Sequence, residues 1–218
     1  MRVFHFVNRE YGMEDIRKRR VKIATFDDLN DPFELLAFQQ TDRTWRRSVG
    51  SMAANINNCL GMLCFSRTFQ NPVQWSHYAD RHRGICLGFD VPDSHLMQVA
   101  YRSERLPIPE EVLERSERLS QNTTEQFLCT KYSHWRYERE VRKFVRLPEP
   151  DPESGLYFSA FSDGLALKQV IVGALASVGR EEVLDALGGL AGSVNCLRTR
   201  LAFGSYRVVK QRNEKLWK

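Results

Sequence analysis

The sequence is poor in cysteine, and its cysteines lack the spacing of a metal site or a disulfide framework. The chain of 218 residues has five, an odd number, and no two of them form a C-x-x-C pair. Cys64 and Cys86 lie inside apolar runs, where we expect them to be buried as small hydrophobic residues. This cysteine usage favours a reducing compartment, so we expect a cytoplasmic protein.

Long hydrophobic runs are also missing. No continuous apolar stretch approaches the roughly 20 residues that a helix needs to cross a bilayer. The first residues do not contain the apolar region of a signal peptide either. We therefore expect no membrane partner.

Several signatures of catalysis are absent as well. The sequence contains no P-loop, no G-x-G-x-x-G and no G-x-S-x-G, and its histidines and carboxylates show no zinc-ligand spacing. We therefore expect no metal site, while a cysteine–histidine nucleophile stays open. The net charge is +5, which permits a nucleotide or nucleic acid as ligand without requiring one. We identify no dense basic patch with interleaved aromatics, so nucleic acid stays only a possible partner.

What the sequence does contain is enough apolar material for a core. Apolar residues make up 42% of the chain, which supports a single domain over residues 1–218, with a helical insert over 103–134. Strands are predicted at 3–7, 21–26, 35–39, 62–65, 85–89, 99–101, 137–147, 156–161, 167–175, 194–197 and 202–209. Helices are predicted at 13–20, 42–60, 107–119, 123–132 and 181–190, with a short one from Pro72. Strands outnumber helices without strict alternation, which indicates an α+β fold.

The stretch 61–90 concentrates the most distinctive side chains. An apolar run ends at Ser66, a short helix with Trp75 and Tyr78 on one face follows, and a second apolar strand comes after Gly84. Two aromatic rings beside a hydroxyl can form a small-molecule pocket in which a planar ring stacks. The same residues can equally form a core, and helical spacing of aromatics more often means core.

A charged segment near residue 140 offers paired carboxylates. If 137–147 is a strand, then Glu138, Glu140 and Arg142 share one face. Two close carboxylates can stabilise a cation that develops on a sugar, unless Arg142 neutralises them. The alternative is a solvent-facing ion-pair ladder, to which we give about two chances in three.

Two further candidates lie near the N-terminus. His5 stands between two phenylalanines in the first strand, where it could donate to a ribose hydroxyl or a phosphate, although such a residue is more often structural. Asn30 follows in D-D-L-N-D-P-F-E, a segment with strong turn signals. We count Asn30 as a candidate ligand residue, with a purely structural role in the turn as the alternative.

Taken in order, F-H-F, L-N-D-P-F-E, C-F-S, W-S-H-Y-A-D-x-H-x-G-I-C-L-G-F and W-x-Y-E-x-E-V-R resemble a bacterial family called domain of unknown function 2971. The resemblance runs from about His5 to Gly173. Members of that family are linked to phage-defence and abortive-infection neighbourhoods, so the resemblance implies a role there. It implies no reaction.

A more distant resemblance implies a chemistry. A His on the first strand, an aromatic-hydroxyl segment and a late Glu are similar to the His-Tyr-Glu layout of ADP-ribosyltransferases, whose split, bent β-sheet grips NAD. The roles that this resemblance implies are ribose contact by His5, nicotinamide stacking by Tyr78 with Trp75 and His77 as rivals, and a place beside the ribose for Ser66. It also implies that Glu140 stabilises the oxocarbenium-like transition state and that Glu138 orients the acceptor.

We therefore expect an NAD-dependent ADP-ribosyltransferase-like protein or NAD glycohydrolase, with NAD as substrate and an unknown macromolecular acceptor. The rivals are a non-enzymatic nucleotide-sensing or protein-binding module, in toxin–antitoxin or phage defence, and an RNA-modifying effector. Geometry discriminates between the first two. An enzyme requires His5, Tyr78 and Glu140 to line one open cleft, whereas a module predicts that they are buried apart or paired off.

Overall fold

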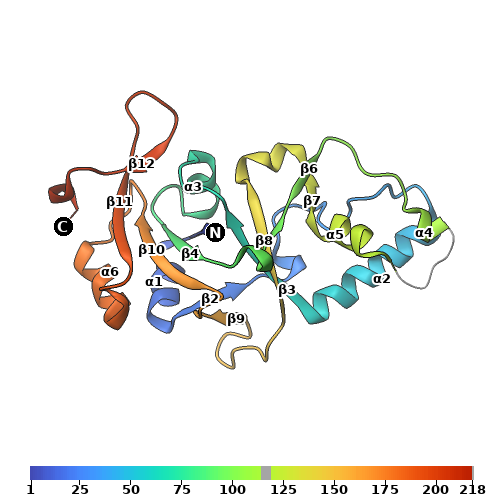
Figure 1. Ribbon diagram of the computed structural model, residues 1–218, viewed down its shortest axis with the longest axis horizontal. Helices are drawn as coiled ribbons and strands as arrows, with labels where there is room; N and C mark the ends of the chain where they lie inside the picture. The colour runs from blue at the N-terminus through green and yellow to red at the C-terminus, as the bar shows by residue number, and fades with distance from the viewer. Residues whose placement is uncertain (114–118, 218) are drawn as a thin grey trace.

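The computed structural model describes residues 1–113 and 119–217, and its elements run along one long axis (Figure 1). The strands are β1 (Arg2–Val7), β2 (Arg20–Ile23), β3 (Leu60–Ser66), β4 (Ile85–Asp90), β5 (Met97–Gln98), β6 (Ala100–Arg102), β7 (Thr130–Tyr132), β8 (Glu140–Arg146), β9 (Tyr157–Ala160), β10 (Ala166–Val172), β11 (Asn195–Leu201) and β12 (Val208–Lys210). The helices are α1 (Arg9–Lys18), α2 (Arg43–Cys59), α3 (Pro72–Tyr78), α4 (Glu110–Leu113), α5 (Gln121–Cys129) and α6 (Arg180–Leu187). The α+β prediction is confirmed.

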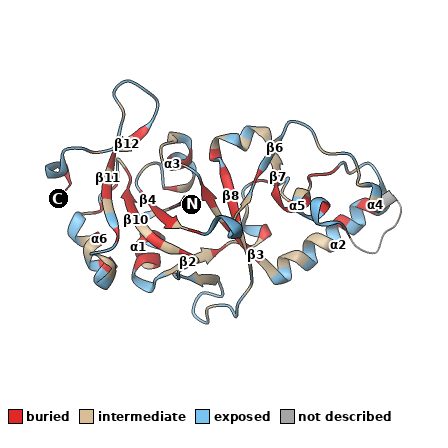
Figure 2. Cartoon of the chain, viewed as in Figure 1, coloured by how far each residue is buried: buried red, intermediate tan, exposed pale blue. Residues whose placement is uncertain are grey.

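The described strands form an open, bent eight-stranded sheet in the order β12-β11-β10-β4-β1-β3-β8-β5. Two small ribbons accompany it, the antiparallel pair β2–β9 and the parallel pair β6–β7. Strands β4 and β10 lie near the middle of the sheet, where β4 is buried from Ile85 to Phe89 and β10 is buried at Leu167 and over 170–172, which explains the apolar runs at these positions (Figure 2). The outer face of α2 is largely exposed.

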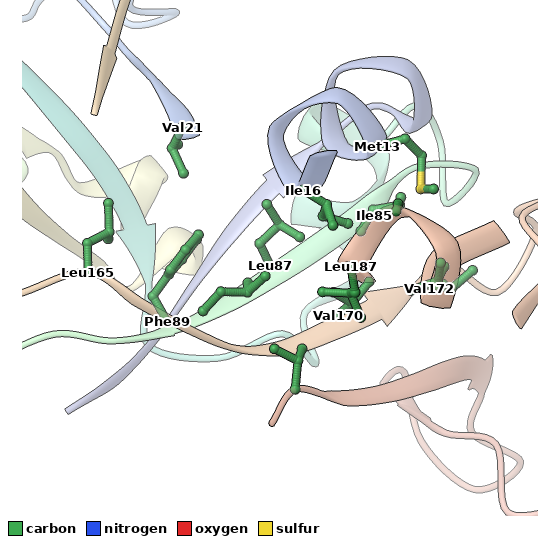
Figure 3. Packing of buried hydrophobic residues seen from close by; sticks show 14 of the residues in the cluster. Met13, Ile16, Val21, Ile85, Leu87, Phe89, Leu165, Val170, Val172 and Leu187 are labelled. Atoms are coloured by element: carbon green, nitrogen blue, oxygen red, sulfur yellow. The ribbon is translucent and has the colours of Figure 1, made fainter. Parts of the chain in front are cut away.

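The main core lies between the sheet and helices α1 and α6. Met13 and Ile16 of α1 pack with Ile85 and Leu87 of β4 and with Leu187 of α6 (Figure 3). Because side chains alternate along a strand, the opposite face of the same strands carries a separate cluster beneath α3, which includes Phe4, Phe6, Trp75, Cys86 and Ile171.

A second core lies at the other end of the molecule, around α2 and α5 (Figure 1). Trp45 and Val49 of α2 pack there with Phe127 and Leu128 of α5. The segment between the paired strands β6 and β7 returns to this core, and it is the region predicted as a helical insert. The described residues therefore form three apolar clusters, one on each face of the central strands and one around α2 and α5.

Several predicted elements are corrected by the structure. The helix predicted at 13–20 begins at Arg9, because Asn8 accepts a hydrogen bond from the Tyr11 amide as its N-cap. The strand predicted at 35–39 is not one, and only Phe38 forms an isolated bridge there. Of the helix predicted at 107–119, the structure has Glu110–Leu113, while residues 114–118 lie outside the described part.

Two strand predictions and one helix prediction are corrected too. The strand predicted at 137–147 begins only at Glu140. The helix predicted at 123–132 ends at Cys129, and 130–132 form β7. The strand predicted at 202–209 is the projecting loop of a β11–β12 hairpin and the short strand that follows it. No helix among the described residues is long and apolar enough to cross a membrane.

Candidate functional site

The sheet is nearly divided between β1 and β3. Strand β1 pairs with β4 over its whole length, from Arg2 to Val7, but it meets β3 at a single residue pair, Phe4 opposite Ser66. We call this divergence the seam. A hollow of about 290 Å³ opens along it, lined by residues of both strands.

Six of the seven candidate residues line this hollow. They are His5, Asn30, Ser66, Tyr78, Glu138 and Glu140. They come from six different segments of the chain, so the tertiary structure brings together what lies up to 135 positions apart in sequence. The roles expected for them are not decided by this arrangement alone.

Trp75 is the candidate that does not line the hollow. Its side chain is fully buried against Phe6, with the ring centroids 5.2 Å apart, and its indole nitrogen donates to the Phe69 carbonyl at 2.5 Å. Trp75 therefore anchors α3 to the sheet, whereas Tyr78, one turn later, presents its ring to the hollow.

His5 is held in one orientation. Its Nδ1 lies 3.1 Å from the Cys64 carbonyl across the seam and must donate to it, since a carbonyl only accepts. Burial lowers the pKa of His5, although the bond to Cys64 opposes this shift. The imidazole is therefore neutral near pH 7, and Nε2 is left as a hydrogen-bond acceptor.

Ser66 has a positioning role. Its hydroxyl lies 2.7 Å from the Glu138 carbonyl, to which it can donate, and Gln74 Nε2 donates to the same carbonyl at 3.0 Å. The Thr68 amide in turn donates to the Ser66 hydroxyl at 3.2 Å. These buried bonds fix the backbone of Glu138 against β3 and α3.

Glu138 lies at the end of a 3-10 helix (Ser133–Glu138), and not on a strand as predicted. Arg139 follows it with a left-handed backbone (φ 48°), which turns the chain into β8. The prediction that Glu138 shares a strand face with Glu140 and Arg142 is therefore wrong. Only Glu140 and Arg142 share such a face.

The two carboxylates still meet, through Lys131 of β7. Lys131 Nζ donates to Glu138 Oε2 at 2.8 Å and to Glu140 Oε2 at 3.2 Å. The Tyr78 hydroxyl donates to the other Glu138 oxygen. Burial raises the pKa of Glu138 even against the opposing charge of Lys131. Burial and the neighbouring Glu138 charge also raise the pKa of Tyr78, so that its hydroxyl keeps its proton.

Glu140 is the more compensated carboxylate. Arg142, which has no exposed surface, donates to Glu140 Oε1 at 2.8 Å and Oε2 at 3.2 Å. Burial pushes the pKa of Glu140 upward, but the charges of Arg142 and Lys131 outweigh it and bring the pKa to about 2. Glu140 is thus ionised at any ordinary pH. The expectation that Arg142 pairs with Glu140 is met in this geometry.

Glu34 completes the cluster. Arg142 donates to its two carboxylate oxygens at 2.6 and 2.9 Å, a bidentate pair, and Lys131 lies 3.5 Å from it. When all groups are ionised, the three carboxylates and two cations carry a net charge of −1. We call these five residues, Glu34, Lys131, Glu138, Glu140 and Arg142, the charged cluster.

Sequence reasoning missed two members of this cluster as functional candidates. Lys131 was placed in a helix, and Glu34 follows a turn whose geometry Asp31 sets by accepting from the Phe33 amide. Glu34 lies 97 positions before Lys131 in the sequence, and Lys131 belongs to a strand that was predicted as part of a helix. No local pattern could have revealed either residue.

A wider groove continues from the hollow. It measures about 1110 Å³ and shares Phe6, Lys22, Asn30 and Tyr78 with the hollow. Arg9 and Arg17 of α1 also line it. The seam is therefore an open cleft with a charged, aromatic inner end and a wider end that carries cations.

Within the described part of the chain, no three His, Cys, Asp or Glu residues are grouped as a metal ion would require. No curated protein and no solved structure matches the chain. The model of the family described as Protein of unknown function (DUF2971) matches residues 74–143, which contain most of α3, Tyr78 and both candidate glutamates. The resemblance to that family is thereby confirmed, over a shorter range than the expected His5 to Gly173.

Proposed function

We propose that the protein binds NAD at the seam and breaks the bond between nicotinamide and ribose, with water or a macromolecule as the acceptor of ADP-ribose. One observation carries the proposal: a buried cluster with a net charge of −1 faces a hollow that Tyr78 and His5 also line. Such a site favours a ligand on which positive charge develops.

The dimensions support a division of the dinucleotide between the two spaces. The hollow of about 290 Å³ would take the nicotinamide ribose, and the groove of about 1110 Å³ would take the ADP part. Arg9, Arg17 and Lys22 line the groove and would contact the two phosphates, although Arg9 would have to leave Glu182 and Lys22 would have to leave Asp28 to do so. Tyr78 lines both spaces, so its ring lies where a nicotinamide ring would stack.

In the proposed step, the C1′–N bond breaks and its electron pair leaves with nicotinamide, which becomes neutral. The positive charge left on the ribose is stabilised by a carboxylate until an acceptor oxygen or nitrogen adds to C1′ and loses its proton. Both Glu140 oxygens already accept from Arg142. Among the described residues, Glu138 has one cationic neighbour, Lys131, whereas Glu140 has two, so more of the negative charge of Glu138 is left to act on the ribose. We therefore assign the stabilising role to Glu138, and we assign to Glu140 the positioning of Lys131 and of the β8 end of the site.

The test is release of nicotinamide from NAD, measured by chromatography, with the purified protein alone and with added bacterial lysate as a source of acceptors. Glu138→Gln should lower the rate roughly 100-fold or more, since it removes a preorganised charge. Glu181→Gln, on the exposed side of α6 and outside both the hollow and the groove, is the control and should keep most of the activity. Absence of both NAD binding and nicotinamide release by the intact protein would refute the proposal.

The activity should also depend on pH. Because burial raises the pKa of Glu138, its charge is lost at a higher pH than that of an ordinary glutamate. The rate of nicotinamide release should therefore fall as the pH is lowered through that raised pKa. A rate that stays constant down to the ordinary range of glutamate would contradict the assignment of Glu138.

A second candidate function is a nucleotide-sensing module without turnover. The observation that favours it is the pairing of Glu140, Arg142 and Glu34 in a buried ion network, which needs no reaction to explain it. Calorimetry that detects NAD or nucleotide binding, with no nicotinamide released, would select this function. In either case a role in phage defence remains part of the proposal, because it comes from the family's genomic associations.

A further inference from the structure

The positive charge of the protein is concentrated in its last segment. Residues 195–218 contain seven Lys or Arg and one acidic residue, a surplus of six, while the whole chain has a surplus of five. The preceding 194 residues therefore carry a net charge of −1. A basic surface restricted to one segment is the electrostatic signature of contact with a polyanion.

The same segment carries the most exposed aromatic side chains of the described chain. Strands β11 and β12 form an antiparallel hairpin whose loop projects from the body (Figure 1) and is exposed (Figure 2). Phe203 is 94% exposed and Tyr206 is 98% exposed. We call residues 198–212, with this loop at the tip, the arm. Since neither ring packs against the fold, neither contributes to its core.

The charges on the arm are not neutralised by the rest of the protein. In the part of the chain that the structure describes, Arg200, Arg207, Lys210 and Arg212 have no carboxylate within 4.0 Å. The Arg200 guanidinium lies 4.4 Å from the centroid of the Phe203 ring, so a cation and an aromatic face already lie together.

A separate pocket of about 650 Å³, which we call the arm pocket, lies beside the arm. It lies between the loop residues 201–207, which include both exposed aromatics, and Pro72 and His82 near α3. Burial lowers the pKa of His82, so its ring is neutral near pH 7. The arm pocket thus offers the neutral ring of His82 on one side and aromatic and cationic groups on the other.

We propose that the arm binds single-stranded nucleic acid. Its bases would stack on Phe203 and Tyr206, and its phosphates would contact Arg200, Arg207 and Lys210. Aromatic platforms interleaved with cations are the means by which proteins bind single strands without reading sequence. This proposal is independent of NAD chemistry, since the arm lines neither the seam nor its groove. It revises the expectation from sequence that no basic patch with interleaved aromatics is present.

The arm does not suit the other partners of similar chemistry as well. A membrane-binding element needs a continuous apolar face, whereas Gly204, Ser205 and Arg207 surround the two rings. A second copy of the chain would bring the same surplus of positive charge to the interface and would be repelled.

The experiment measures fluorescence anisotropy of labelled oligo-U and oligo-dT of about 15 nucleotides, a length that covers one such site. The full-length protein should bind both single strands, and duplex DNA of the same length more weakly. The double variant Phe203→Ala/Tyr206→Ala should weaken binding at least tenfold, because stacking on each ring is removed. Both side chains are almost wholly exposed, so the variant should fold normally, which its melting temperature checks.

Two controls separate stacking from charge. Tyr132→Ala removes a tyrosine that is 43% exposed at the end of β7, outside the arm, and should leave binding unchanged. Arg207→Gln/Lys210→Gln should lower the slope of log affinity against log salt by about 1.4, since each lost phosphate contact removes roughly 0.7. The matched variant Arg43→Gln/Arg47→Gln on α2 should leave the slope unchanged.

Three results would overturn the proposal. In the first, the double aromatic variant binds oligonucleotides as tightly as the unaltered protein. In the second, the protein binds anionic lipid vesicles through the two aromatics but does not bind oligonucleotides. In the third, the protein is a dimer in size-exclusion chromatography and the dimer disappears in the double variant. Glu138→Gln should bind oligonucleotides like the unaltered protein. Loss of nicotinamide release with retained oligonucleotide binding would therefore leave this inference intact.

Discussion

At the scale of single residues, the charged cluster is the feature that most constrains the protein. Arg142 has no exposed surface and is bonded to both Glu34 and Glu140. A buried ion pair is weak evidence for stability, because desolvation offsets the attraction. Removing one partner is different, since it leaves the others charged and buried without compensation.

We therefore expect Arg142→Met to lower the free energy of unfolding by about 3–5 kcal/mol. Arg2→Met, which breaks the partly exposed Arg2–Asp90 pair, is the control and should cost less than about 1 kcal/mol. Urea unfolding of both variants measures the difference. Equal losses would mean that the charged cluster contributes no more than a surface pair.

The cysteines provide a second residue-scale prediction. Cys59 is exposed, whereas burial raises the pKa of the Cys64 and Cys86 thiols well above the ordinary value and that of Cys129 to about 11. Iodoacetamide at neutral pH should therefore modify Cys59 first and leave Cys64 and Cys86 unmodified in the folded protein. Mass spectrometry of digested samples reports the order. Cys64 is only half-buried and lines the hollow, so early labelling of it would contradict the raised pKa of its thiol.

At the scale of elements, α1 contains a carboxylate in an unfavourable place. Asp15 is 5% exposed, and burial, with the neighbouring Glu14 charge, raises its pKa to about 7. A carboxyl whose pKa is higher in the fold than in the unfolded chain resists ionisation in the fold. The free energy of unfolding therefore falls as the pH rises from about 4 to about 7.

Asp15→Asn should remove this loss. Between about pH 5 and about pH 8, we expect the stability of the variant relative to the unaltered protein to rise by about 2 kcal/mol. Urea unfolding at the two pH values measures it. A variant that is uniformly less stable at both would show that Asp15 is held by a favourable interaction that the structure does not contain.

The turn between α3 and β4 depends on a close approach of backbone. A Cβ built on Gly84 would lie 2.2 Å from the Val7 carbonyl oxygen. Because this oxygen belongs to the backbone, a change of side-chain rotamer cannot remove the clash. Gly84→Ala should therefore destabilise the protein by about 1–3 kcal/mol. Gly50→Ala, in the exposed middle of α2 with nothing within 4 Å, should instead stabilise it by about 0.5–1 kcal/mol. Thermal melting of the two variants should move in opposite directions.

At the scale of the whole molecule, the seam separates two differently supported parts of the sheet. Strands β4 and β10 are paired on both sides, whereas β3 is paired along its length only with β8. Opening of the seam therefore breaks few hydrogen bonds. A cleft at such a place can admit a ligand with little disturbance of either core.

Hydrogen exchange should report this difference. We expect amides of β4 and β10 to exchange slowest, and amides of β3 to fall into two classes, slow where they pair with β8 and faster where they face the seam. Uniformly slow exchange across β3, as slow as in β4, would contradict the seam. Added NAD should slow the faster class if the proposed function holds.

The α+β class, the apolar strands predicted at 62–65, 85–89 and 167–175, and six of the residues that line the hollow could be predicted from the sequence alone. This was possible because period-two and period-3.6 patterns and turn residues are local properties of the chain. The helix cap at Asn8 and the strand start at Glu140 were missed, since boundaries depend on single hydrogen bonds and on one left-handed residue, Arg139.

Only the tertiary structure decided what surrounds each candidate. Trp75 and Tyr78 have equivalent sequence signals, yet packing against Phe6 buries one while the other lines the hollow. Lys131 joins Glu138 and Glu140, and Glu34 is a third carboxylate that shares Lys131 and Arg142 with them, although no local pattern links it to them. Burial and charge pairing are sums over neighbours distant in sequence, and for that reason they follow from the fold and not from spacing.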